Sequence, residues 1–278
     1  MKTSDKYAAA KVPAQITAMF WGLKLLTTGM GEAMSDFMGD HSVPIAGAVG
    51  VLGLALALWL QLRQSRYRAP FYWFVVMMIA IFGTMTADAI HDGLSIPYPL
   101  TTAGFGLITA AIFFTWYRTE GTLSIHSIDT RRRELYYWAA VYATFAFGTA
   151  AGDMTAASLN LGYGHSILLF AAIILIPAIG WWRFGMNWIA AFWFAYIVTR
   201  PIGASFADWF SKPPATSGLG LGDGAVSGVT LVVFIALVTY VTVTKHDGSV
   251  IDAHPPHAHP LAHPPAPHST AALTPETE

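Results

Sequence analysis

The sequence predicts an all-α, polytopic membrane protein with about eight transmembrane helices, arranged as four two-helix repeats. Of its 278 residues, 54% are hydrophobic and only 11% are charged, whereas an ordinary globular domain has roughly 25% charged residues. A helix needs about 20 mostly apolar residues to cross a bilayer, and such segments recur along the whole chain. Neither a cleavable leader nor a single anchor accounts for segments that recur in this way.

Composition also excludes several classes of function. The formal net charge is −1, so there is no electrostatic basis for a nucleic-acid partner. The chain contains no cysteine, which removes disulfides, thiolate metal sites and a cysteine nucleophile. No nucleophile paired with a base, no HExxH-type metal helix and no phosphate-binding loop is present in the sequence. We therefore expect neither an enzyme nor a covalent cofactor.

Hydropathy and flanking charges place the eight expected transmembrane helices. They cover residues 13–28, 43–62, 71–87, 100–117, 135–152, 165–182, 188–204 and 224–244. The first is the least apolar, because Lys24 interrupts it. Pro201 predicts a kink or a break in the seventh, since proline cannot donate a backbone hydrogen bond inside a helix.

Basic residues cluster after every second helix, which predicts the orientation of the chain. The set comprises Arg63, Arg66, Arg68, Arg118, Arg131, Arg132, Arg133, Arg183 and Lys245. Short cytoplasmic loops are enriched in lysine and arginine. We therefore expect both termini of this inner-membrane protein to lie in the cytoplasm.

The expected organisation follows from these helices. An N-terminal cytoplasmic segment covers residues 1–10, and the repeats cover residues 11–68, 69–118, 135–183 and 184–245, with a cytoplasmic loop at 119–134. The tail, residues 246–278, is rich in proline and histidine and is expected to be disordered. Its histidines are His254, His257, His259, His263 and His268. Neutral imidazoles bind transition metals, but a solvated tail without a role is equally compatible with this composition.

The first helix of each repeat carries the same polar stripe near its outer end. The stripe consists of Thr28, Glu32 and Asp36, then Thr84, Asp88 and Asp92, then Thr149, Asp153 and Ala157, and finally Arg200, Ala204 and Asp208. A glycine or alanine precedes the middle position each time, at Gly31, Ala87, Gly152 and Gly203. Residues four apart lie on one helical face, so each stripe presents its polar groups in one direction.

Ionised acids along an apolar helix are costly unless they face water, a partner charge or a bound cation. We therefore expect Glu32, Asp88 and Asp153 to meet in a shared, water-filled site. Asp36, Asp92 and Asp208 have a second interpretation as caps of helix ends in outer loops. Two cations are near this set. Either Lys24 or Arg200 could serve as an internal counter-ion. Lys24 could instead be displaced when a cation or proton binds, and Arg200 could instead belong to the outer edge of its helix.

With the repeats in view, the chain resembles a bacterial membrane-protein family with four tandem copies of a repeat of unknown function. In that family each copy holds two transmembrane segments and a characteristic tryptophan. The resemblance covers roughly residues 11–245 and is carried by KVPAQITAMFWGLKLLTTGMGEAMSD, TEGTLSIHSIDTRRRELYYWAA and FAFGTAAGDMTA. The candidate tryptophans are Trp21, Trp73, Trp138 and Trp193, at two different offsets from the acid position. The resemblance implies a fold and no activity.

The residues favour a transporter of a hard divalent cation such as manganese or magnesium, coupled to protons. Oxygen ligands suit these ions, and carboxylates that must lose protons before they bind metal supply the coupling. Glu32, Asp88 and Asp153 would form the metal site. Further oxygens would come from Thr28, Thr84 and Thr149, and His91 and Asp92 would lie at the outer mouth. The expected partners are the lipid bilayer, the metal ion and protons.

Two alternatives remain open from the sequence. The first is a cation or proton channel whose four hairpins surround a pore with an acidic filter. The second is a non-transporting assembly or sensor protein in which the carboxylates pair with Lys24 and Arg200. A homo-oligomer is compatible with all three interpretations.

Overall fold

The computed structural model describes residues 10–245, which are helical apart from short loops and contain no strand. The helices are α2 (Ala18–His41), α3 (Val43–Leu62), α4 (Ala69–Asp88), α5 (Tyr98–Glu120), α6 (Arg131–Asp153), α7 (Gly162–Ile173), α8 (Leu175–Phe184), α9 (Trp188–Ser211) and α10 (Asp223–Thr244). Two π-helical turns, η1 (Ala89–Gly93) and η3 (Met154–Ser158), follow α4 and α6 directly. Short 3₁₀ turns lie at Ile125–Ser127 and Pro214–Thr216. The all-α prediction is confirmed, and the histidines of the tail lie outside the described residues.

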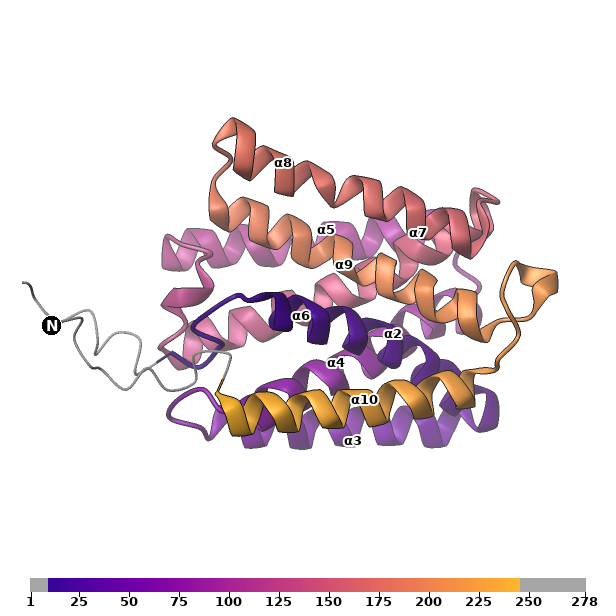
Figure 1. Cartoon of the computed structure of the whole chain (residues 1–278), viewed down its shortest axis with the longest axis horizontal. Helices are drawn as coiled ribbons and strands as arrows, with labels where there is room; N and C mark the ends of the chain where they lie inside the picture. Colours follow the sequence, from indigo (N-terminus) through magenta and orange to yellow (C-terminus); the bar gives the residue numbers. More distant parts are fainter. Residues whose placement is uncertain (1–9, 246–278) are drawn as a thin grey trace, which may run out of the picture.

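The first helices of the four repeats form a closed inner ring. In this ring α2 packs against α4, α4 against α6, α6 against α9, and α9 returns to α2. Their facing sides supply most of the apolar core, including the buried rings of Trp73, Trp138 and Trp193. Figure 1 shows the helices running nearly along the long axis of the molecule, with α2, α4, α6 and α9 between the outer helices.

The second helix of each repeat covers the first helix of the following repeat. α3 packs on α4, α5 on α6, α7 and α8 on α9, and α10 returns to pack on α2. The four hairpins are thus interlocked in a cycle, and the last closes on the first. The outward faces of these helices are apolar, with Leu52, Leu107 and Val232 largely exposed. Such a surface is unfavourable in water and suits a lipid environment.

Six segments within residues 10–245 are long and apolar enough to cross a membrane. They are Val43–Leu62, Ala69–Gly93, Tyr98–Glu120, Gly162–Phe184, Trp188–Ser211 and Asp223–Thr244. The expected number of eight is therefore not confirmed. The two that do not qualify are α2 and α6. α2 contains Lys24, Glu32 and Asp36, and α6 begins with three arginines.

Three expected helix bounds need correction. The first helix does not cover residues 13–28. It begins at Ala18, where the hydroxyl of Thr17 accepts a hydrogen bond from the N–H of Phe20, and it continues to His41. The sixth span is interrupted at Ile174, between α7 and α8. Pro201 does not break the seventh helix, because α9 continues through it to Ser211.

Small residues permit the close approach of the ring helices. A Cβ atom on Gly31 would overlap with the Cβ of Ala80 in α4 and would lie 2.7 Å from its carbonyl carbon. A Cβ atom on Gly203 would lie 2.6 Å from the Cβ of Thr28 in α2. Because these two positions are equivalent in the repeat, the same small residue brings neighbouring helices together at two places in the ring.

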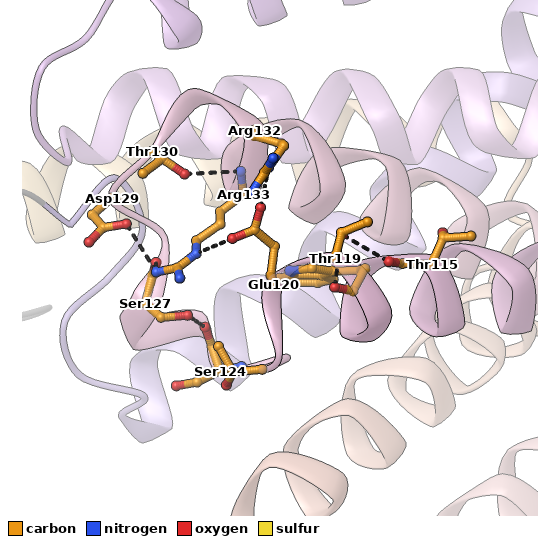
Figure 2. A network of polar contacts seen from close by, with 11 residues as sticks. Thr115, Thr119, Glu120, Ser124, Ser127, Asp129, Thr130, Arg132 and Arg133 are labelled. Carbon is orange, nitrogen blue, oxygen red and sulfur yellow. Dashed lines mark hydrogen bonds and ion pairs between the residues drawn. The ribbon is translucent and has the colours of Figure 1, made fainter.

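The two ends of the bundle differ in charge. We call the end that carries Asp36, Asp92 and Asp223 the acidic end, and the end that carries Arg63, Arg118 and the Arg131–Arg133 run the basic end. At the basic end, Glu120 at the close of α5 pairs with Arg132 and Arg133. Arg133 also pairs with Asp129 at 3.3 Å, and Figure 2 shows this network fastening the loop between α5 and α6.

A second ion pair joins the N-terminal segment to the basic end. The Nζ of Lys11 lies 2.7 Å from a carboxylate oxygen of Glu134, which is fully buried. The side-chain amide of Gln61 donates to the other carboxylate oxygen at 3.2 Å, and Val12 is buried beside them. Chain segments before α2, at the end of α3 and at the start of α6 are therefore tied together.

Candidate functional site on the ring axis

The first position of the polar stripe converges from all four repeats. The Nη2 of Arg200 lies 2.5 Å from the hydroxyl of Thr149 and also donates to the hydroxyl of Thr84. Its Nη1 donates to the backbone carbonyl of Thr28 at 3.4 Å. The hydroxyl of Thr28 instead donates to the carbonyl of Leu25 in its own helix. All four stripe residues are buried, so they form one layer across the ring, which we call the threonine–arginine layer.

The next turn toward the acidic end brings three carboxylates together. Glu32 of α2, Asp153 of α6 and Asp208 of α9 each have one oxygen within 4.8 Å of the other two. We call them the acid cluster. Glu32 forms an ion pair with Arg200, with 2.5 Å between Oε2 and Nη2. Within residues 10–245, the carboxylates of Asp153 and Asp208 form no hydrogen bond or ion pair. Three ionised carboxylates so close together repel one another, so a proton or a cation is needed among them.

The cluster differs in composition from the expected metal site. Glu32 and Asp153 meet as expected, while Asp88 lies beside them as an electrostatic neighbour of both. Asp208, which the sequence placed one turn further out, completes the cluster instead. The fourth repeat has Ala204 where the other repeats have an acid. A carboxylate from the next turn of α9 therefore reaches the position that Ala204 cannot fill.

A local change in helix type explains which outer acids face inward. In the second and third repeats the chain enters a π-helical turn directly after Asp88 and after Asp153. The extra residue of a π turn rotates the following side chains by roughly 100°. The side chain of Asp92 is therefore 75% exposed. α2 and α9 remain α-helical through Asp36 and Asp208, which stay on the inward face.

His91 and Asp92 lie in the π turn at the acidic end. The ring of His91 stacks on Tyr98, with 3.5 Å between centroids. Its Nδ1 lies 2.8 Å from the carbonyl oxygen of Ile96. The histidine is thereby fixed against the loop that enters α5, and its Nε2 lies 3.7 Å from Asp92.

Asp36 has a cation of its own. The Nζ of Lys212, directly after α9, lies 2.7 Å from Asp36 and 3.3 Å from Asp223 at the start of α10. Burial lowers the pKa of Lys212, but the adjacent carboxylate of Asp36 outweighs this effect and the pKa is raised above its usual value. Lys212 therefore joins the first and fourth repeats as a charged bridge.

Lys24 lies one turn from the threonine–arginine layer, toward the basic end. Its Nζ is 4.0 Å from the ring centroid of Phe145 and 4.4 Å from that of Tyr196. The side chain is 1% exposed, and the amine forms no hydrogen bond within the described residues. Of the two expected counter-ions, only Arg200 pairs with a carboxylate, and Lys24 rests against aromatic faces.

The ring beyond Lys24 is filled with apolar side chains. The following turn toward the basic end carries Phe20, Val76, Val141 and Phe192, all buried. Further on, the hydroxyls of Tyr72 and Tyr137 lie 2.6 Å apart. An apolar layer therefore separates Lys24 from this tyrosine pair.

Four equivalent helical hairpins closed into a ring, with six segments apolar enough to cross a membrane, indicate a helical membrane protein built by internal repetition. The family described as "Repeat of Unknown Function (DUF347)" matches residues 19–67, 71–122, 136–187 and 191–247. The chain belongs to this family, as the resemblance in its sequence indicated. No curated protein and no solved structure matches it.

Proposed function

We propose that the protein is a membrane transporter for a hard divalent cation of the manganese or magnesium type, coupled to protons. One observation carries the proposal. Carboxylates from three separate repeats converge in the ring interior, and two of them form neither a hydrogen bond nor an ion pair within the described residues. Manganese and magnesium are bound by oxygen ligands and retain several waters, so a few carboxylates suffice to hold them.

Proton coupling follows from the same carboxylates. Without metal, mutual repulsion favours protons on the acid cluster. A divalent cation favours the ionised carboxylates, so its binding releases protons. The cluster thus holds protons or metal in turn, which is the requirement for exchange.

The interior favours a carrier over an open channel. Two cationic side chains, Arg200 and Lys24, follow the acid cluster along the axis, and apolar residues fill the ring beyond them. A cation at Glu32 therefore has no continuous polar path to the basic end. Release on that side requires the ring helices to rearrange, as expected for transporters built from repeats.

In this proposal α2 and α6 also cross the membrane, because they lie in the same ring as α4 and α9. The chain then has eight spans. The basic end faces the cytoplasm of a bacterial cell, in line with the distribution of arginines. The acid cluster lies in the half of the ring nearer the opposite side of the inner membrane.

The test is Mn²⁺ uptake into proteoliposomes, with and without a pH gradient, for the wild type, Asp208→Asn and Asp92→Asn. The two aspartates occupy the same position of the repeat, but only Asp208 belongs to the acid cluster. We expect saturable, gradient-dependent uptake, reduced by about tenfold or more in Asp208→Asn because a charged ligand is lost, and unchanged in Asp92→Asn. Equal rates in all three proteins, or no uptake of Mn²⁺ or Mg²⁺, would contradict the proposal.

A second candidate is a non-transporting membrane protein, which the ion pair between Glu32 and Arg200 favours. Such a pair could serve only to hold α2 and α9 together. Asp153 distinguishes the two functions, because it has no ion pair among the described residues. In a transporter, Asp153→Asn abolishes uptake and leaves the fold intact. In a structural protein, neither wild type nor variant moves ions.

A further inference from the structure

Arg200 occupies a position that holds threonine in the other three repeats. Its guanidinium reaches the ring axis and contacts a residue from each of α2, α4 and α6. It is fully buried, and its Nε has no partner in the described part of the chain. One charged partner, Glu32, and several neutral oxygens therefore hold this cation.

The surroundings leave Arg200 little freedom to withdraw. A Cβ atom on Gly148 would lie 2.6 Å from the Cβ of Arg200, so α6 passes directly against its side chain. Phe145 lies between the two cations, with the Arg200 Cζ 5.3 Å and the Lys24 Nζ 4.0 Å from its ring centroid. Phe145 and the side chain of Lys24 occupy the space on the side of the guanidinium toward the basic end. The guanidinium is thus confined to the edge of the acid cluster.

We propose that Arg200 is a built-in competitor for the transported cation, so that the guanidinium and the bound metal neutralise Glu32 in turn. The inference rests on the proposed function, and it identifies the residue that opposes metal binding at that site. A metal that binds through Oε2 of Glu32 displaces one charge-assisted contact, at 2.5 Å, and the hydrogen bond from the Thr84 hydroxyl, at 3.2 Å. The hydroxyls of Thr84 and Thr149 and the carbonyl of Thr28 then retain the guanidinium, because neutral oxygens accept its hydrogen bonds without a formal charge.

This arrangement predicts how affinity responds to substitution. A hydrogen bond to a charged group corresponds to roughly tenfold to a hundredfold in an equilibrium constant. Arg200→Thr removes the competitor and gives the fourth repeat the residue of the other three. Arg200→Lys keeps the charge, but it replaces the planar fork with a single ammonium that cannot reproduce the contacts to both threonines.

The experiment is equilibrium titration of the full-length protein in detergent with Mn²⁺, at constant pH, for the wild type, Arg200→Thr, Arg200→Lys and Glu32→Gln. We expect Arg200→Thr to bind Mn²⁺ at least tenfold more tightly than wild type, Arg200→Lys to fall between them, and Glu32→Gln to bind more weakly. In proteoliposomes, Arg200→Thr should retain the ion and show slower release. If Arg200→Thr does not fold, the comparison of Mn²⁺ affinity between wild type and Arg200→Lys tests the proposal.

The outcomes separate the two proposals. If wild type binds and transports Mn²⁺ but both Arg200 variants bind no more tightly than wild type, Arg200 is not a competitor and the proposed transport site stands. If no protein in the series binds or transports Mn²⁺, the transport site itself is refuted, and the competitor with it.

Discussion

Gly31 lies where α2 of the first repeat packs against α4 of the second, and its replacement tests the ring directly. Gly31→Ala adds one methyl group, which would overlap with Ala80 and lie 2.7 Å from the carbonyl carbon of that residue. Because the obstacle is backbone, α2 and α4 must move apart. The matched control is Gly22→Ala in the same helix, where the position is exposed and an added Cβ meets no atom within 4 Å.

The expected magnitudes follow from these contacts. In a helix, alanine is favoured over glycine by about 1 kcal/mol, and this gain applies to both variants. Overpacking at Gly31 costs about 3 kcal/mol, the upper part of the usual range. Gly22→Ala should therefore stabilise the protein by about 1 kcal/mol, and Gly31→Ala should destabilise it by about 2 kcal/mol.

Thermal unfolding in detergent measures this difference. For a chain of this size 1 kcal/mol corresponds to about 2–4 °C in Tm, so the two variants should differ by about 6–12 °C. The rate of Mn²⁺ uptake should also fall in Gly31→Ala, because Glu32 is the next residue and moves with α2. Equal melting temperatures for the two variants would refute the close packing of α2 on α4.

Two further predictions concern buried lysines. Lys24→Met replaces an unpaired amine with an apolar chain of similar length. The gain from removing a buried polar group outweighs the lost contacts with Phe145 and Tyr196, so we expect a stabilisation of about 1 kcal/mol; a lower Tm would show that the aromatic contacts dominate. Lys11→Met leaves Glu134 buried without its cation and should cost about 3 kcal/mol. Adding Glu134→Gln should recover much of this loss, whereas additive losses in a double-mutant cycle would argue against the pair.

The sequence alone determined the helical class and the fourfold repetition. Both follow from local patterns, because apolar length specifies a potential membrane helix and the four-residue spacing of the stripes recurs in each copy. The same spacing placed Thr84, Thr149 and Arg200 at equivalent positions, and the structure brings these residues together. Equivalent positions of the repeat lie at the same level along the axis of a closed ring. This part of the site was therefore predictable from the sequence.

Other features depended on interactions between repeats. The outward position of Asp92 required the π turn after Asp88, and the place of Asp208 in the acid cluster required the uninterrupted α9. Both are backbone features that no residue spacing reveals. The length of α2 was underestimated because its acids lower its hydropathy. Two of these acids, Glu32 and Asp36, are accommodated by facing the ring interior.

The primary sequence thus specified what each repeat contains, because periodicity and hydropathy act within a single segment. Tertiary packing decided which side chains meet. It pairs Arg200 with Glu32 and packs Lys24 against Phe145 and Tyr196. It also leaves the side chain of Asp92 exposed. Long-range electrostatic partners arise only when helices distant in sequence are placed side by side, so they depend on the closure of the ring.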